Sequence, residues 1–448
     1  MTLAPARRTA LRVLGRVRRD SAFSGPTLAR ELSSAGLSAD DRALATRLVY
    51  GVLGAEGLLD EVLDRHLERS LEPRVRDALR LAVYELLFGR VPSYAVVDQA
   101  VTAVRSLRAQ AAPLANAVLR AVAAEASGFP WGDPATDRTA LARATAHPMW
   151  IVDELYGSLG EDHAREALTS PAEPPPTFIR LDPFAADTAS TRTALCDAEL
   201  TPSPPDPDCF RALRPSALFA GSRDHRGWFA MDAGAQMAPA LCRPGPGLHV
   251  LEVGAGRGNK TICLQAIASR AGGTARITAL EAHRGKADGL RARLRESAVP
   301  CVDVVVGDGT QADALVGSGT FDVAFVDAPC TGLGTLRRYP EKRWRLRPED
   351  VERLHGLQTA LLAAAARTVK PDGRVVYSTC SVARRENDDV VDEFLGGAEG
   401  IDFTIEPVRE FVPDQWRTFC DARGWFRSWP TDEGPDGHFV AVLRRSGT

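Results

Sequence analysis

The sequence lacks the features that mark membrane-spanning, disulfide-stabilised or zinc-binding proteins. It contains no run of about eighteen uncharged apolar residues, the length that a bilayer-spanning helix requires. Its eight cysteines form no C-x-x-C pair and show no zinc-ligand spacing, so we expect reduced thiols and no metal. The first residues have no signal-peptide layout. These absences favour a cytoplasmic protein without a membrane partner.

A strong basic charge is also missing. The formal net charge is −3, and only four of the 55 basic residues are lysine. This balance does not by itself indicate a nucleic-acid partner, although phosphate contacts depend on where basic residues cluster. The hydrophobic fraction of 44% and the charged fraction of 25% are ordinary for a soluble globular protein. The length of 448 residues suits two or three domains.

The residue pattern predicts three parts. Residues 1–130 repeat apolar residues at helical spacing, as at Leu58 and Val62, and predict a compact domain of short helices. Residues 131–228 carry the proline-rich stretches SGFPWGDP, SPAEPPP and TPSPPDPD, which predict a semi-rigid linker or small lobe, with PTFIRLDP as a strand. Residues 229–448 alternate apolar strands with helices, which predicts a doubly wound, mostly parallel α/β sheet.

A glycine-rich turn follows the first strand of the predicted sheet. Its backbone could approach a ligand closely, and it reads Gly254-Ala255-Gly256-Arg257-Gly258-Asn259-Lys260. Acidic residues lie at the ends of successive strands: Glu252, Glu281, Asp308 and Asp327. Ligands of open α/β sheets bind outside the carboxyl ends of the strands, so these residues are candidates for one site. Any one of them alone could be a solvated loop residue.

The whole set favours S-adenosylmethionine as the cofactor. A dinucleotide enzyme uses the first two strand ends but has no evident use for Asp308 and Asp327. S-adenosylmethionine would place its methionine part against the glycine loop, its ribose at Glu281 and its adenine near Asp308.

Two cysteines each close an apolar run at this predicted edge. Cys330 follows Asp-Ala-Pro, and Cys380 lies within Ser-Thr-Cys-Ser. A cysteine at a strand end is more often a small buried hydrophobe, so the pattern alone leaves a shared site open. A basic run between them, RRYPEKRWRLR, could favour a thiolate or hold a phosphate backbone, or it could be a solvated charge run. Its candidate RNA-binding residues are Arg337, Arg338, Arg343 and Arg345.

The chain resembles known families in both halves. ARRTALRVLGRV, DRALATRLVYGVL, LRLAVYELLF and LANAVLRAV, in this order, resemble the NusB-like RNA-binding domain. FVDAPCTGLGTLRRYPEKRW, VKPDGRVVYSTCSVARREN and the terminal DGHFVAVL resemble the RsmB/Sun branch of the NOP2/Sun RNA cytosine-5 methyltransferases. The order of the two parts is that of the 16S ribosomal RNA enzyme of this family.

The sequence departs from the family pattern at two places. The usual glycine loop Cys-Ala-Ala-Pro-Gly-Gly-Lys is replaced by Gly254–Lys260, which keeps the final lysine. The usual Gln-Asp-Glu-Ala-Ser-Gln is replaced by Met231-Asp-Ala-Gly-Ala-Gln236. These changes leave open how tightly the cofactor binds and which nucleotide is modified.

The resemblance implies methylation of C5 of a cytosine in RNA, with 16S ribosomal RNA as the expected partner of a monomeric enzyme. It implies that Cys380 attacks C6, Asp327 holds the N3 edge, Cys330 assists release and Lys260 helps to position the pocket. Residues alone do not divide these roles between the thiols, since both lie at strand ends. Two alternatives stay open: a non-catalytic RNA-binding or assembly factor on a degenerate methyltransferase fold, and a transfer RNA methyltransferase.

Overall fold

The computed structural model describes residues 2–447 except 21, 23, 171–174, 186–188 and 219–226. These residues pack as two units, which we describe separately. The helical unit comprises Met1–Asp153 and Leu336–Arg347, and the sheet unit comprises Glu154–Thr335 and Pro348–Thr448. These two packing units differ from the three parts, 1–130, 131–228 and 229–448, that the sequence predicts. The three-part division into domains remains a prediction.

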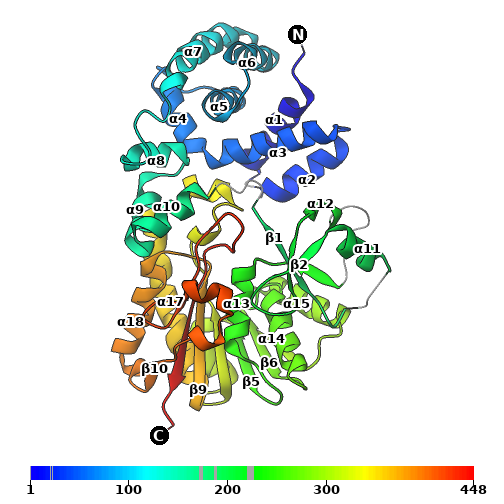
Figure 1. Ribbon diagram of the computed structural model, residues 1–448, viewed down its shortest axis with the longest axis vertical. Helices are drawn as coiled ribbons and strands as arrows, with labels where there is room; N and C mark the ends of the chain where they lie inside the picture. Colours follow the sequence, from blue (N-terminus) through cyan, green and yellow to red (C-terminus); the bar gives the residue numbers. More distant parts are fainter. Residues whose placement is uncertain are drawn as a thin grey trace. The chain divides into compact units, whose positions relative to one another are not determined.

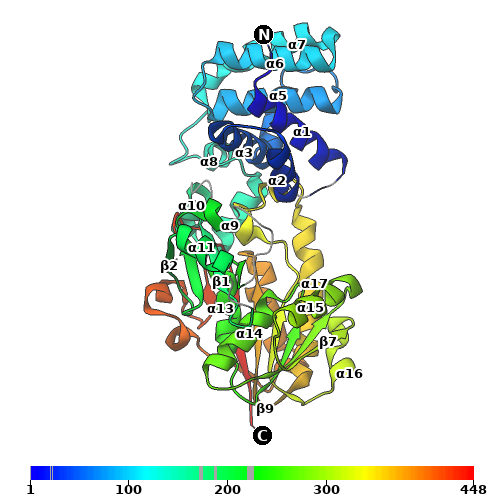
Figure 2. The ribbon, with the colours of Figure 1, turned by 90° about the vertical axis from the view of Figure 1, so that its right-hand side faces the viewer.

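The helical unit is built from amphipathic helices joined by short turns (Figure 2). Local signals start several of them. Ser38 accepts a hydrogen bond from the backbone of Asp41 at 3.1 Å and so caps α3, and α1 and α5 have proline in their first turn. The helices are α1 (Pro5–Arg19), α2 (Ser24–Ser34), α3 (Ala39–Gly54), α4 (Glu56–Asp64), α5 (Pro73–Phe88), α6 (Ser93–Leu107), α7 (Ala112–Glu125) and α8 (Arg138–Ala144), and α9 (Met149–Leu159) begins here.

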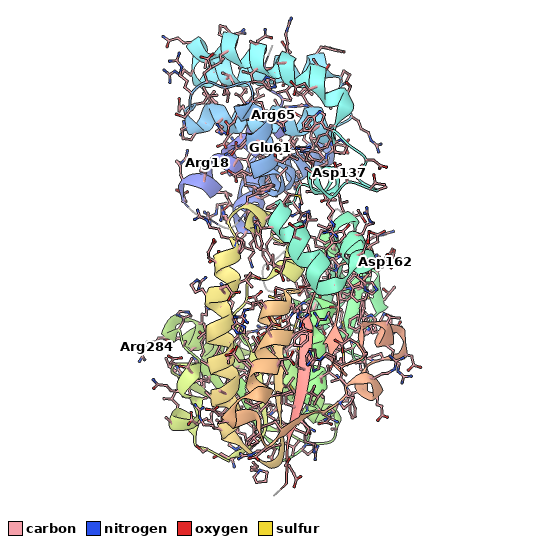
Figure 3. The ribbon with its side chains drawn as sticks, turned by 90° about the vertical axis from the view of Figure 1, so that its left-hand side faces the viewer. Arg18, Glu61, Arg65, Asp137, Asp162 and Arg284 are labelled. Atoms are coloured by element: carbon pink, nitrogen blue, oxygen red, sulfur yellow. The ribbon has the colours of Figure 1, made fainter. Side chains whose placement is uncertain are left out.

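The core of the helical unit contains the apolar stripes that the sequence predicted. Leu14, Leu48, Leu59 and Leu79 come from four different helices, and each is at most 1% exposed. Arginine–carboxylate pairs border this core; for example Arg18, labelled in Figure 3, contacts the buried Asp77 at 2.5 Å. Arginine thus joins neighbouring helices where lysine is almost absent.

A short segment from far along the chain completes the helical unit. Leu336–Arg347 contains the 3-10 helix Pro340–Trp344, which packs against α3 and α4. The indole of Trp344 donates to the carbonyl of Gly54 at 2.7 Å, and the buried Glu341 accepts from Ser24 at 2.9 Å. This segment contains the basic run of the sequence.

The sheet unit is organised around a mixed sheet with the strand order β10-β12-β9-β8-β5-β6-β7, with β11 paired to β12. The strands β9, β8, β5, β6 and β7 run parallel, whereas β12 and β10 are antiparallel to their neighbours. Their bounds are β5 (His249–Val253), β6 (Arg276–Glu281), β7 (Val302–Val306), β8 (Phe321–Asp327), β9 (Val369–Thr379), β10 (Phe403–Ile405), β11 (Phe426–Arg427) and β12 (Phe439–Arg445).

Helices cover both faces of this sheet (Figure 1). One face packs against α17 (Pro348–Thr368) and α18 (Asp388–Gly396), with α16 (Ala312–Val316) beside α17. The other carries α13 (Ala233–Cys242), α14 (Asn259–Arg270) and α15 (Arg284–Glu296). Strands buried on both faces read as continuous apolar runs, and this is why the sequence indicated them so clearly.

The sheet unit also contains a small lobe. Its strands form an antiparallel sheet in the order β2-β3-β1-β4, in which β1 is the strand predicted from PTFIRLDP. Fully buried Arg180 on β1 pairs with Asp206 and lies 3.4 Å from Asp208. Most of the SPAEPPP stretch falls outside the described residues. The elements of the lobe are β1 (Thr177–Leu181), β2 (Leu200–Pro202), β3 (Cys209–Ala212), β4 (Trp228–Ala230), α11 (Ala189–Asp197) and α12 (Pro215–Leu218), and the helix α10 (Glu161–Thr169) precedes them in the chain.

The predicted fold class, a helical region followed by a mostly parallel α/β sheet, is confirmed. Within the described ranges, no helix combines the length and apolar character needed to cross a membrane. Nor does any cluster of three or more His, Cys, Asp or Glu side chains suited to a metal ion occur in the part of the chain described here.

Candidate active site

The predicted site residues of the sheet unit follow parallel strands and share the carboxyl edge of the sheet. Glu281 and Asp327 are the last residues of β6 and β8, and Cys380 directly follows β9. Asp308 lies two residues beyond β7. Because these strands are paired in parallel register, their ends meet at one edge.

The two cysteines are in contact. The sulfur atoms of Cys330 and Cys380 lie 3.2 Å apart. The hydrogen bond with Cys380, and then burial, raise the pKa of the Cys330 thiol well above its ordinary value. This environment therefore disfavours the thiolate form of Cys330.

Lys260 and Asp327 form an ion pair beside the thiols. Lys260 comes from the first turn of α14, directly after the glycine loop, and its ammonium group contacts the Asp327 carboxylate. Burial lowers the pKa of Lys260, but Asp327 more than offsets this effect, and both thiols also favour its charged form. The net pKa of Lys260 is raised, so it supplies a fixed cation at the edge of the sheet.

The glycine loop approaches the end of β8 closely. Gly254 has a φ of +86°, and a Cβ added to it would lie 2.6 Å from the carbonyl oxygen of Asp327. The backbone N–H groups of Gly254 and Ala255 donate to the carbonyl of Leu280 at 2.9 and 3.2 Å, which ties the loop to β6. Only glycine fits at position 254, both for its backbone angle and for the space available.

Carboxylates support the loop from two sides. Glu281 accepts from the backbone N–H of Gly256 at 2.8 Å and from that of His283 at 2.9 Å. Glu252 lies fully buried below the loop, where Thr261 donates to one of its oxygens at 2.6 Å and the other has no hydrogen-bond partner. Burial raises the pKa of Glu252 to about 8. Asp308 is exposed and accepts from the backbone of Thr310 at 2.9 Å.

Arg293 was not singled out in the sequence, yet it fixes the unusual part of the glycine loop. It donates to the carbonyl of Arg257 at 3.0 Å and contacts the side chain of Asn259. Its guanidinium lies 4.6 Å from the ring centre of Phe229 on β4. Arg257 itself is exposed, as is Arg284 at the start of α15, labelled in Figure 3. A basic residue on α15 carries no sequence signal for such a role.

The four arginines of the basic run belong to the helical unit. Arg337 and Arg338 are half-buried, and Arg345 is exposed. Arg343 donates to the carbonyl of Thr145 at 3.3 Å. The structure therefore brings together the thiols, Lys260, Asp327, the glycine loop and Glu281, and places the candidate RNA-binding arginines in the other unit.

Comparison with known proteins matches separate families to the N-terminal helices and to the region that contains the parallel sheet. The family description "16S rRNA methyltransferase RsmB/F" matches residues 240–444, and "NusB family" matches residues 4–124. A Mycobacterium tuberculosis protein, provisionally named methyltransferase MT1451, is 33% identical, with 99% of this chain and 97% of that protein covered. The Pasteurella multocida ribosomal RNA small subunit methyltransferase B is 27% identical over 90% of this chain and 88% of its own length.

A solved structure shows the same fold. The crystal structure of PH0851 superposes with a TM-score of 0.79, covering 99% of this chain and 100% of its own, at 23% sequence identity. Since the match to the Mycobacterium tuberculosis protein runs the length of both chains, and the two family descriptions match the two halves in the predicted order, the family is shown. The chain belongs to the RsmB/F family of 16S rRNA methyltransferases and carries a NusB family region ahead of the methyltransferase region.

Proposed function

We propose that this protein methylates C5 of a cytosine in 16S ribosomal RNA, using S-adenosylmethionine, through a covalent bond between Cys380 and C6 of the base. The observation that carries the proposal is the contact between two thiols, 3.2 Å apart, at the carboxyl edge of the sheet. A methyltransferase that acts on a nucleophilic oxygen or nitrogen needs no thiol, whereas C5 of cytosine must first be activated by covalent addition at C6.

The residues at the sheet edge suit S-adenosylmethionine. The absence of a side chain at Gly254 lets the glycine loop lie close against the backbone of Asp327 at the end of β8. Glu281 lies at the end of β6 and is proposed to hold the ribose hydroxyls, and the exposed Asp308 is proposed to lie near the adenine. When bound, this cofactor supplies an electrophilic methyl carbon. Gly254–Lys260, Glu281, Asp308 and Asp327 are the residues proposed to hold it.

Four side chains have separate proposed roles in the reaction of the base. The Cys380 thiolate adds to C6, and Asp327 holds N3 so that the electrons displaced from the C5–C6 double bond are stabilised. After C5 has gained the methyl group, its proton must leave so that the double bond reforms and Cys380 is expelled. Cys330 assists this release. Lys260 holds Asp327 in place and adds positive charge beside the thiols, which stabilises a thiolate.

The family resemblance assigns the nucleophile to Cys380, since either sulfur of the contacting pair could donate the hydrogen bond between them. The contact with Cys380 and burial raise the pKa of Cys330, which disfavours its thiolate and therefore attack by Cys330. To assist release, Cys330 must first lose its own proton, because only its thiolate can accept the proton from C5.

RNA would be held by basic residues and by the NusB family region. Arg337, Arg338, Arg343 and Arg345 are proposed to contact phosphates, with Arg345 the most accessible of the four. The names of the Pasteurella and other relatives point to small-subunit ribosomal RNA as the partner. The base must be unstacked before the thiols can reach it, so an exposed cytosine in a loop or an assembly intermediate is the expected target. We propose a cytoplasmic, monomeric enzyme.

Bisulfite sequencing of ribosomal and transfer RNA from cells with and without the gene tests this proposal. We expect one cytosine of 16S ribosomal RNA to lose its protection in the deletion strain, and to regain it when the gene is restored. Loss of protection in transfer RNA instead would assign a different substrate. Unchanged protection everywhere, combined with no S-adenosylmethionine binding by calorimetry, would favour a non-catalytic assembly factor.

A further inference from the structure

Glu386 holds the loop that contains Cys330. It is fully buried, and one of its oxygens accepts from the backbone N–H of Thr331 at 2.8 Å and from the amide of Gln358 at 3.0 Å. The other oxygen accepts from the Thr331 hydroxyl at 2.5 Å. Gln358 also donates to the carbonyl of Pro329 at 2.8 Å. The residues on both sides of Cys330 are thus fixed through one carboxylate.

Asn387, the next residue, holds the loop that contains Cys380. Its side-chain oxygen accepts from the Thr379 hydroxyl at 2.6 Å, and its side-chain nitrogen donates to the carbonyl of Ser381 at 3.0 Å. Thr379 and Ser381 flank Cys380 directly. The side chain of Asn387 is fully buried, so no water competes for these bonds.

The dipeptide Glu386-Asn387 and the two cysteine-containing loops form one buried hydrogen-bond network. The hydroxyl of Tyr377 donates to the backbone carbonyl of Glu386 at 2.7 Å, which anchors the dipeptide to β9. The hydroxyls of Thr331 and Ser381 lie 3.3 Å apart and connect the loops to each other. Movement of either loop would break bonds that involve groups shielded from solvent, and such groups are costly to leave unpaired.

We propose that Glu386 and Asn387 are positioning residues that set the distance between the two thiols, one residue for each loop. The proposal rests on the proposed function, because the distance between the sulfurs matters only if both act on one base. Both residues are fully buried, so we assign them no contact with the base. Their string ARREN was recognised in the sequence only as part of a family pattern.

Glu386 has a second, electrostatic effect that can be tested separately. Its negative charge is one of the causes that raise the pKa of Cys330, after the hydrogen bond with Cys380 and burial. The other titratable groups that interact with Cys330 are Cys380, Tyr377 and Lys260. Glu386→Gln keeps the shape and can keep the hydrogen bonds, but it removes the charge. Glu386→Ala removes both.

Oxidation of the purified full-length protein measures the distance between the thiols without RNA or cofactor. Diamide takes two electrons and two protons from a pair of neighbouring thiols, which become one disulfide while diamide becomes the hydrazine. Peptide mass spectrometry follows the Cys330–Cys380 disulfide. We expect rapid formation in the wild-type protein and in Glu386→Gln, and formation about tenfold slower in Glu386→Ala and Asn387→Ala. Wild-type rates in all variants would overturn the positioning role.

Activity on RNA supplies the second measurement. With the thiol distance kept, Glu386→Gln should still form the covalent RNA adduct, and the pH profile of its release should shift to lower pH because the pKa of Cys330 falls. An unshifted profile would overturn the electrostatic part. The control is Asp389→Asn, which removes a partly exposed charge three residues away and should change neither measurement.

The two kinds of failure can be told apart. If the wild-type enzyme forms no adduct with any RNA, the proposed function is wrong, while the oxidation rates still report whether the dipeptide holds the loops. If Glu386→Ala does not fold, Glu386→Gln and Asn387→Ala still decide the outcome. Recovery of the wild-type oxidation rate by Gln but not by Ala would assign the effect to hydrogen bonding.

Discussion

The sulfur atoms of Cys330 and Cys380 lie 3.2 Å apart although 50 residues separate them in the sequence. The strands that precede them, β8 and β9, are parallel neighbours, and the connection between the two strands contains the helix α17. Both strands therefore end at the same edge of the sheet. A parallel pair requires such a crossover, and the crossover delivers the residue after each strand to the same place. Packing of a hydrophobic core does not require two thiols in contact, so their contact favours a functional role for the pair.

Replacement of each thiol should stop the reaction at a different stage. Cys380→Ala should bind RNA and S-adenosylmethionine but form neither adduct nor product, because it lacks the nucleophile. Cys330→Ala should permit attack and methyl transfer but leave the enzyme attached to its RNA, because the group used after adduct formation is missing. The adduct is measured as a slowly migrating band that survives denaturation.

The opposite pattern, with the band in Cys380→Ala and none in Cys330→Ala, would reverse the two roles. Full activity in both variants would show that the thiols are core residues and that the proposed chemistry is wrong. Cys242→Ala is a suitable control, because this fully buried cysteine lies on α13 and donates to the backbone of its own helix.

Gly254→Ala should weaken cofactor binding. The new methyl group would lie 2.6 Å from the carbonyl of Asp327, and the backbone angle of +86° is itself unfavourable for alanine. Gly272→Ala is the matched control, since its φ is +97° but no atom would lie within 4 Å of the added methyl group. Both variants should lose roughly 1 kcal/mol of stability from backbone strain, and Gly254→Ala should lose more because of the clash with the carbonyl of Asp327. Calorimetry should show weakened S-adenosylmethionine binding only for Gly254→Ala.

Glu252 should make the stability of the sheet unit fall as pH rises. Burial raises its pKa from 4.5 to about 8, so between these values the folded state holds a proton that the unfolded state has released. The contribution of this group is therefore complete below pH 4.5 and is lost as pH rises through about 8. Urea unfolding across this range should show a flatter pH dependence for Glu252→Gln than for the wild type. An equally steep dependence would mean that other groups cause it.

Trp344→Ala should destabilise the helical unit by about 3 kcal/mol, because the indole packs against its core and donates to the carbonyl of Gly54. Urea unfolding measures this loss. Arg345→Ala, at the exposed neighbouring position, should change stability by less than about 0.5 kcal/mol.

If Arg345 contacts a phosphate, Arg345→Ala should reduce the salt dependence of RNA binding by about one unit of slope. An unchanged slope would leave it a solvated surface residue.

The sequence predicted the parallel sheet well because strands buried on both faces are continuous apolar runs. The apolar runs His249–Val253, Arg276–Glu281 and Phe321–Asp327 are predicted as strands by their residue pattern, and β5, β6 and β8 have these same bounds. The antiparallel strands β10 and β12 were not predicted. The edge strand β10, Phe403–Ile405, carries too few residues to show a pattern, whereas β12 has seven residues and was noted only as part of a family motif. Strand ends also indicated which residues share the site, because topology alone brings them to one edge.

The packing of the basic run could not be predicted in the same way. RRYPEKRWRLR reads as a solvent-exposed charge run, yet Trp344 and Glu341 within it are tied to Gly54 and Ser24, about 300 residues earlier. No local periodicity encodes a contact at that separation. The roles of Arg293 and Glu386 were missed for a similar reason, since each depends on partners from other parts of the chain.

The membership of Leu336–Arg347 in the helical unit has a consequence for the order in which the protein matures on the ribosome. The helices up to Asp153 emerge early in translation, but Glu341 and Trp344, which pair with Ser24 and Gly54, are added only after most of the sheet unit has been synthesised. The helical unit therefore begins to fold early, but it can be completed only after Leu336–Arg347 has been synthesised. A nascent chain that stops before residue 336 lacks the segment that pairs with Ser24 and Gly54, so this surface of the helical unit stays uncovered until that segment is made.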